Sequence, residues 1–140
     1  MKMKLKFYIF SFLFFFINII MLLNCFANEN IINNNKLRYY SINKAFISDE
    51  YNNESVVFSI ALKKIFCKTI FTNVDKQAAI YHIWYYKDNL IKEKQLLISP
   101  KKYSINSEIC LRETDKGPWR VEVLDEERRM LKIIRFSVID

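Results

Sequence analysis

The feature that most constrains this chain is a series of short runs rich in Ile, Val, Phe, Tyr and Thr, which end at the turn-forming clusters DEYNN, NVDK, KDN, SPK and ETDKGP. No stretch has a long amphipathic helical period, although residues 55–65 stay ambiguous because a short apolar run has no diagnostic period. Regularly spaced strands without helices between them predict an all-β fold, an antiparallel immunoglobulin-like β-sandwich of about seven to eight strands. The expected strands cover residues 43–48, 55–61, 64–72, 78–87, 90–98, 102–111, 119–125 and 129–138.

The only glycine in the chain, Gly117, stands with one of the two prolines, Pro118, directly before Trp119. Glycine accepts a positive φ, and proline lacks an N–H that the first residue of a strand can spare, so the pair sets the angle at which a strand begins. Alternation then points Trp119, Val121 and Val123 toward the core. The DEER turn and the run MLKIIRFSV complete a predicted hairpin. A phosphate-binding loop would need several glycines opening a helix, so this segment indicates a fold element.

The N-terminus has the order of a secretory signal, because three early lysines precede an apolar run over residues 7–23. Cys25 and Ala27 occupy the minus-three and minus-one positions of a signal-peptidase site before Asn28. LLNC at 22–25 also resembles a bacterial lipobox, in which Cys25 would become the lipidated first residue, and an uncleaved anchor is the third alternative. All three place the rest of the chain in the periplasm or cell envelope, with membrane contact only through the N-terminal segment.

The sequence divides into a signal peptide or anchor at 1–27, an Asn-rich tether at 28–42 and a β-sandwich domain at 43–140. The net charge of +7 falls when the signal lysines are removed, and the other charges are interspersed. A nucleic-acid binder needs a basic stripe or cluster. The short basic stretches at 62–64 and 99–102 do not form one, so no nucleic-acid partner is expected.

The sole histidine, His82, falls on the same strand face as Trp84 and is expected at the edge of the core, bonded to a backbone carbonyl. A zinc site needs three or four ligands, and the ligand-type residues lack that spacing, so neither a metal nor another cofactor is expected. No Gly-x-Ser-x-Gly elbow is present. The favoured function is therefore noncatalytic binding of an envelope protein or glycan, and the alternative is an envelope hydrolase that uses His82 with Glu122 or Asp125.

In chain order, the sequence contains the segments AFISDEYNNES, IFCKTIFTNV, AIYHIWYYKDNLI, KKYSINS and GPWRVEVLDEERRMLKIIRFSV. Over about residues 43–138 this order resembles a bacterial family, the domain of unknown function DUF2914. Three residues differ from the usual pattern: Ser55 follows Glu54 where the family usually has proline, and the others are Lys102 and Ile83. The resemblance implies the fold and an exported or membrane-attached location, and it implies no activity. It rests on Phe71, Thr72, His82, Trp84, Tyr85, Tyr103, Ser104, Gly117, Trp119, Val121, Val123 and Asp125.

Two further predictions concern covalent structure and the partner site. Cys67 and Cys110 are expected to form a disulfide, because pairing is favoured in an oxidising compartment. If His82 and Trp84 point inward, alternation points Tyr81 and Tyr85 outward. Arg120 also points outward on the Trp119 strand, and if the two strands are neighbours these three side chains share one surface. Tyr and Arg are enriched at interface hot spots, so Tyr81, Tyr85 and Arg120 are the candidate binding residues.

Overall fold

The computed structural model describes residues 39–140, which form strands and two short 3-10 helices, η1 (Ile60–Leu62) and η2 (Glu113–Asp115). Each expected strand overlaps an observed one, and the ambiguous stretch at 55–65 divides into the three-residue strand β2, η1 and the start of β3. The all-β prediction is confirmed. The strands are β1 (Ser41–Ser48), β2 (Val57–Ser59), β3 (Lys64–Thr72), β4 (Ala78–Tyr86), β5 (Asn89–Ile98), β6 (Ser104–Cys110), β7 (Gly117–Leu124) and β8 (Met130–Ile139).

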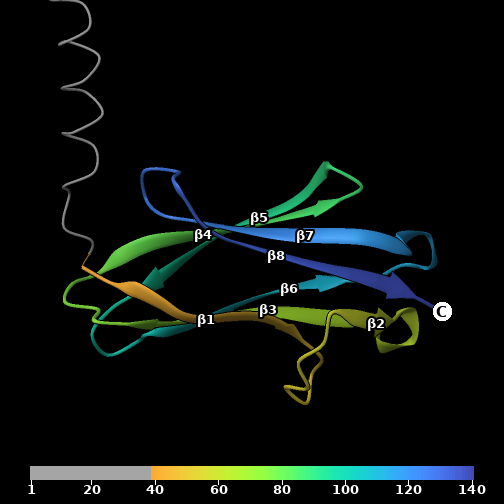
Figure 1. Ribbon diagram of the computed structural model, residues 1–140, viewed down its shortest axis with the longest axis horizontal. Helices are drawn as coiled ribbons and strands as arrows, with labels where there is room; N and C mark the ends of the chain where they lie inside the picture. The colour runs from red at the N-terminus through yellow and green to blue at the C-terminus, as the bar shows by residue number, and fades with distance from the viewer. Residues whose placement is uncertain (1–38) are drawn as a thin grey trace, which may run out of the picture. The chain divides into compact units, whose positions relative to one another are not determined.

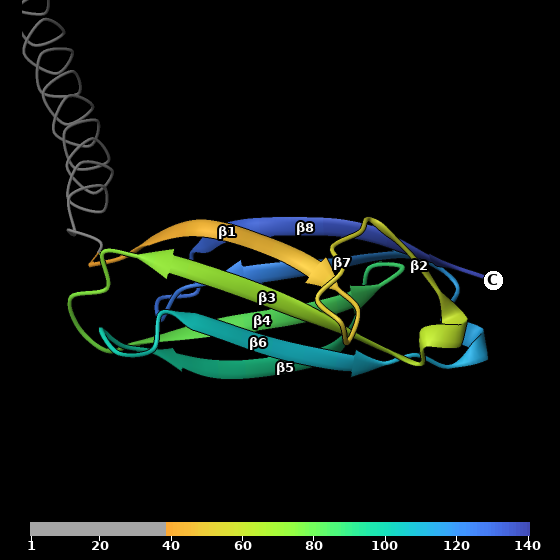
Figure 2. The same ribbon diagram turned by 90° about the horizontal axis from the view of Figure 1, so that it is seen from below.

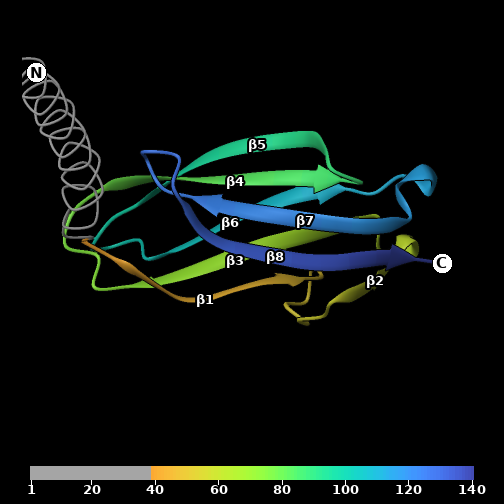
Figure 3. The same ribbon diagram turned by 45° about the horizontal axis from the view of Figure 1, so that its top comes forward.

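Two sheets stack as the layers of a sandwich (Figure 1). The three-stranded sheet has the order β1-β3-β6, and its strands lie side by side in the view from below (Figure 2). The five-stranded sheet has the order β2-β8-β7-β4-β5 and comes forward in the tilted view (Figure 3). Most neighbours are antiparallel as predicted, but β2 runs parallel to β8. The predicted adjacency of the Trp84 and Trp119 strands, β4 and β7, is confirmed.

Strict alternation builds the core between the sheets. On β3 every second residue is buried, from Ile65 to Phe71, and β4 and β7 contribute Trp84 and Val121 from the other layer. Trp84 has no exposed surface and meets Phe136 edge to face, with 6.2 Å between the ring centroids. The inward direction predicted for His82, Trp84, Trp119, Val121 and Val123 is confirmed, since all five side chains are buried.

The start of β7 has the predicted conformation. Gly117 adopts a φ of +126°, which L-residues with a side chain rarely adopt. Pro118 needs no N–H donor there, and its carbonyl accepts a hydrogen bond from the Lys87 amide at 3.2 Å. Beyond it, the indole of Trp119 donates to the Asp115 carbonyl at 2.8 Å. The Gly-Pro pair therefore positions the Trp119 ring in the core.

The predicted disulfide is wrong, because both cysteines are free. Cys67 lies opposite Ser107 in the β3–β6 ladder, whereas Cys110 lies opposite Lys64. The side chain of Cys67 is buried in the core and that of Cys110 is exposed. The two sulfur atoms thus point to opposite faces of one sheet, which a disulfide cannot bridge.

Candidate binding face

The outward surface of the five-stranded sheet, here called the outer face, carries the predicted binding residues. The register places Tyr85 opposite Arg120, and Ile83 opposite Glu122, across the β4–β7 ladder. Residues directly opposite each other point to the same side of a sheet. The structure therefore brings Tyr85 and Arg120 together, and Tyr81 lies on the same face of β4.

Each of the two tyrosines is covered by a guanidinium group. The Arg120 Cζ atom lies 4.0 Å from the centroid of the Tyr85 ring, and Arg128 Cζ lies 3.9 Å from that of Tyr81. Both tyrosines are half-buried. A cation over an aromatic ring contributes roughly 0.5–1 kcal/mol at an exposed site. Burial, followed by the nearby Glu122 carboxylate, raises the pKa of Tyr85. The rings are therefore held in place on the outer face.

Ion pairs surround these stacks. Arg120 Nε donates to Glu122 Oε1 at 2.9 Å, and its Nη1 also pairs with Asp88. The Arg128 guanidinium pairs with Glu93 at 2.7 Å, and that hydrogen bond holds the pKa of Glu93 below its usual range. The position of Arg128 in the β7–β8 turn is not evident from strand alternation, so the sequence prediction missed it.

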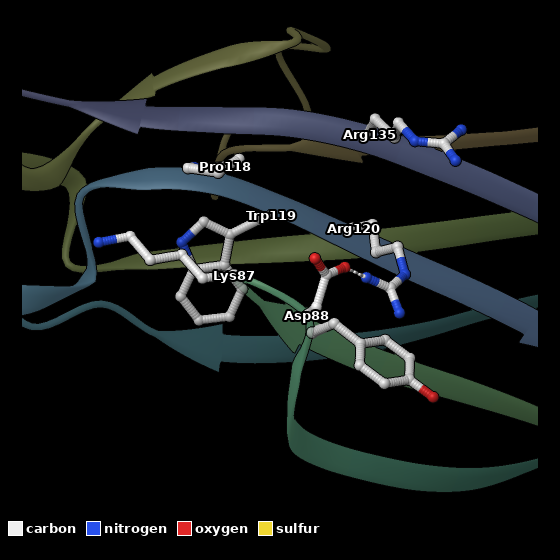
Figure 4. Close-up of a pocket in the computed structure, with 7 residues that line it drawn as sticks. Lys87, Asp88, Pro118, Trp119, Arg120 and Arg135 are labelled. Carbon is white, nitrogen blue, oxygen red and sulfur yellow. Dashed lines mark hydrogen bonds and ion pairs between the residues drawn. The ribbon is translucent and has the colours of Figure 1, made fainter.

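One end of the outer face is hollowed. A cavity of about 130 Å³ lies where the β4–β5 turn meets β7 and β8. Its walls include the cations Lys87, Arg120 and Arg135, with the Asp88 carboxylate among them. Figure 4 shows Asp88 reaching toward Arg120, and Arg135 extending from the neighbouring strand. Strand alternation on β4 also points Lys87 outward. The sequence prediction missed Arg135, because its place opposite Arg120 depends on the β7–β8 register, and Asp88, because it lies in the turn between β4 and β5. Tyr85, Pro118 and Trp119 complete the lining.

Two residues assigned outward on β4 and β7 face outward but are buried. Leu124 lies opposite Tyr81 in the β4–β7 ladder, as alternation predicts, yet only 8% of it is exposed. Ile83 does face outward, opposite Glu122, yet only 6% of it is exposed. Longer side chains on the outer face therefore cover Ile83, and it is not available to a partner.

His82 lies between the sheets with no exposed surface, deeper than the predicted edge of the core. Its partners are hydroxyl groups of the opposite sheet, not a backbone carbonyl: Nε2 lies 3.0 Å from Thr69 Oγ1, and Nδ1 lies 2.9 Å from Ser107 Oγ. The Trp84 indole also donates to Ser107 Oγ, at 2.9 Å. Burial lowers the pKa of His82 to about 4, so the ring is neutral at pH 7.

Neither of the two carboxylates predicted to assist His82 in a hydrolase, Glu122 and Asp125, is a hydrogen-bond partner of His82. Glu122 points to the outer face and pairs with Arg120. Asp125 holds the β7–β8 turn, where its carboxylate accepts the backbone amides of Glu127 and Arg129 at 2.9 Å each. Burial raises the pKa of Asp125, but hydrogen bonds from Arg129 and Glu127 outweigh it and lower the value overall. Glu122 and Asp125 thus stabilise the sheet surface and the β7–β8 turn, respectively.

Some predictions concern residues beyond this site. The signal or anchor at 1–27, the lipidation candidate Cys25 and most of the tether lie outside the described residues. Within residues 39–140 no helix is long and apolar enough to span a membrane. In the same part of the chain, no group of three or more His, Cys, Asp and Glu side chains is placed to hold a metal ion.

Comparison with known proteins supports the resemblance noted in the sequence. Residues 77–138 match the family described as "Protein of unknown function (DUF2914)", so the resemblance is confirmed over this segment. The match covers β4 to β8 except the last residue of β8, and thus includes most of the outer face. The curated proteins contain no match to the chain.

Among solved structures, the chain is similar to parts of large enzymes. The β-glucuronidase of Parabacteroides merdae is 16% identical with a TM-score of 0.48, and the match covers 71% of this chain and 13% of that one. A GH3 β-glucosidase of Bifidobacterium adolescentis is 10% identical with a TM-score of 0.41, covering 71% and 17%. A β-glucosidase of Kluyveromyces marxianus is 13% identical with a TM-score of 0.42, covering 72% and 14%. The chain spans less than a fifth of each, and these partial similarities indicate no function for it.

Proposed function

We propose that the protein is an exported, noncatalytic binding module of the bacterial cell envelope, which holds a protein or glycan partner on its outer face. The observation that carries the proposal is the pair of arginine-covered tyrosines, Arg120 over Tyr85 and Arg128 over Tyr81, on one sheet surface. Tyr, Trp and Arg dominate the binding energy of protein interfaces. Rings already held in position lose less side-chain entropy when a partner binds.

The strand framework supports this role. The tyrosines lie on β4, which is hydrogen-bonded to β5 on one side and β7 on the other, so the site rests on the interior of the sheet. The neighbouring edge strand β5 adds Leu90 and Ile91, which are 58% and 40% exposed. A partner could thus contact apolar surface beside the charged stacks, an arrangement typical of interfaces with an apolar centre and a polar rim.

Export is proposed from the lysine-led apolar run at the N-terminus. Intact-mass measurement of the protein recovered from cells tests it. A chain that begins at Asn28 supports signal-peptide cleavage, and one that begins at a lipidated Cys25 supports attachment to the membrane. A full-length chain in the envelope fraction would leave the uncleaved anchor, whereas a full-length chain in the cytoplasm would refute export.

The binding test removes both rings with the double variant Tyr81→Ala/Tyr85→Ala. The matched control is Tyr51→Ala/Tyr103→Ala, because those tyrosines are 75% and 57% exposed and lie outside the outer face. Each protein is immobilised and incubated with fractionated envelope proteins and with envelope glycans, and bound species are identified by mass. We expect a species retained by the wild type and the control and lost by the double variant.

Circular dichroism is measured on the same samples. A folded Tyr81→Ala/Tyr85→Ala variant that keeps every bound species would refute the outer face as the binding surface. An unfolded double variant would show that the two rings are part of the core, which contradicts their outward placement.

A further inference from the structure

We infer that the cavity beside Arg120 binds an anionic group, a carboxylate or a phosphate, carried by the ligand of the outer face. The inference rests on the proposed function, because the cavity opens on that face and shares Tyr85 and Arg120 with it. It adds the chemical class of the ligand and names three residues that the tyrosine argument does not use, Lys87, Asp88 and Arg135.

The charges of the lining favour an anion. Three of its side chains are cationic and one is a carboxylate. Arg135 lies directly opposite Arg120 in the β7–β8 ladder, where like charges repel and destabilise a sheet. The Arg135 guanidinium forms no hydrogen bond or ion pair with any side chain in residues 39–140. An anion between the two guanidinium groups would relieve this repulsion.

The third cation of the lining, Lys87, also has unused N–H donors. The Lys87 ammonium lies 4.9 Å from the centroid of the Tyr86 ring, a contact that uses none of its N–H donors. Within residues 39–140, no carboxylate pairs with Lys87. Lys87 can therefore donate to an anion in the cavity without giving up another hydrogen bond.

Asp88 occupies the place where the ligand's anion would bind. Its carboxylate pairs with Arg120, yet the Asp88 side chain is 90% exposed. Ion pairs between exposed groups contribute little to stability, so a ligand can displace this one easily. Arg120 would keep its bond to Glu122 and turn its freed N–H groups to the ligand. Asp88 thus competes with the ligand and satisfies Arg120 when no ligand is bound.

The size of the cavity limits what can enter. Drug-sized pockets span about 300–1,000 Å³, and this one holds about 130 Å³. That space suits a single carboxylate or phosphate group with its hydrogen-bonding water. The rest of the ligand would lie on the outer face beside the Tyr85 ring, which links the cavity to the proposed partner site.

The test follows the side-chain Nε–H signals of Arg120 and Arg135 by NMR in the full-length protein at low salt. The probes are inorganic phosphate, glucuronate and glucose, of which glucose is the neutral counterpart of glucuronate. We expect saturable shifts of both signals with phosphate or glucuronate and none with glucose. Phosphate alone shifting them would indicate a phosphate site, and glucuronate alone a carboxylate site.

Anion binding by single-residue variants tests whether the cavity residues form the binding site. Arg135→Gln should weaken binding about tenfold, because it removes a charge-assisted hydrogen bond to the anion. Asp88→Asn should strengthen it several-fold by removing the competitor. Lys101→Gln removes one positive charge from an exposed turn outside the cavity and should leave binding unchanged. Equal weakening by Lys101→Gln and Arg135→Gln, or no saturable shift with either anion, would overturn the inference.

The two proposals can fail separately. If Tyr81→Ala/Tyr85→Ala loses the envelope partner and Arg135→Gln keeps it with full affinity, the binding face stands and the anion site is refuted. If phosphate or glucuronate still binds at Arg135 while the double tyrosine variant keeps its partner, the anion site stands and the tyrosine face is refuted.

Discussion

Burial decides the chemistry of His82. Both ring nitrogens are engaged by hydroxyl groups and no acid is among the partners, so no negative charge offsets the cost of burying a charged ring. Removal from water therefore lowers the pKa, from 6.5 to about 4. A base in this state can neither bind a proton at neutral pH nor reach a substrate at the surface.

The pKa of His82 predicts how stability changes with pH. Between pH 6.5 and about 4 the unfolded chain binds a proton that the folded chain does not. The free energy of unfolding should therefore fall across this window as the pH decreases, by on the order of 3 kcal/mol, and the contribution should be fully present above pH 6.5. Urea unfolding at several pH values measures it, and His82→Gln should lose this part of the pH dependence. Because the chain has one histidine, an imidazole NMR signal that titrates near 6.5 in the folded protein would contradict the prediction.

The free cysteines differ in reactivity for the same reason. Burial raises the pKa of the Cys67 thiol to about 12, whereas Cys110 is exposed. In a Cys25→Ser background, a thiol reagent should label one residue quickly in the folded protein and a second only in urea. Cys110→Ser should abolish the fast reaction. Absence of labelling in urea without reductant would mean that the disulfide forms after all.

At the scale of elements, the hairpin of β7 and β8 organises the outer face, because β7 pairs with β4 on its other side. Gly117 sets its beginning and the buried Asp125 holds its turn. Turn chemistry and alternation are local properties, so this hairpin was predictable from residues 117–138. The register shift near Leu124 was not, because a bulge depends on the partner strand.

Gly117→Ala should destabilise the protein by about 1–3 kcal/mol, because a φ of +126° strains any residue with a side chain. Steric crowding adds little, since the new Cβ would lie 3.3 Å from Lys87 Cε, part of a flexible side chain. Thermal and urea unfolding measure the loss. Pro118→Ala is the matched control and should cost less than about 1 kcal/mol, because the carbonyl at that position still accepts the Lys87 amide. Equal stability of the Gly117→Ala variant and the wild type would contradict the strain argument.

At the scale of the whole molecule, the sheets are joined by a buried polar network as well as by apolar packing. Thr69 and Ser107 belong to β3 and β6 of one sheet, whereas His82 and Trp84 belong to β4 of the other. No buried side-chain polar atom in residues 39–140 lacks a hydrogen-bond partner. A fully satisfied network of this kind favours one alignment of the layers.

Ser107→Ala tests that connection. It would leave His82 Nδ1 and Trp84 Nε1 without their shared partner, and each buried group left unpaired costs about 1–3 kcal/mol. Thr69→Val removes the partner of Nε2 alone and should cost less. Ser104→Ala, at the half-buried start of the same strand, is the control and should change the free energy of unfolding little. A Ser107→Ala variant as stable as the control would show that the network does not hold the sheets together.

The sequence by itself determined the strands, the direction of their side chains and the beginning of the Trp119 hairpin. Each of these depends on period-two alternation and on turn residues close along the chain. It also placed Tyr85 and Arg120 on one face, once β4 and β7 were taken as neighbours.

Only the tertiary structure decided the partners that distant segments bring together. The hydroxyl partners of His82 come from the opposite sheet, and the separation of Cys67 from Cys110 follows from the β3–β6 register. The anion cavity forms only where the fold brings the β4–β5 turn beside Arg135 of β8. What a charged side chain can bind depends on the other charges packed around it, and here those charges come from distant segments.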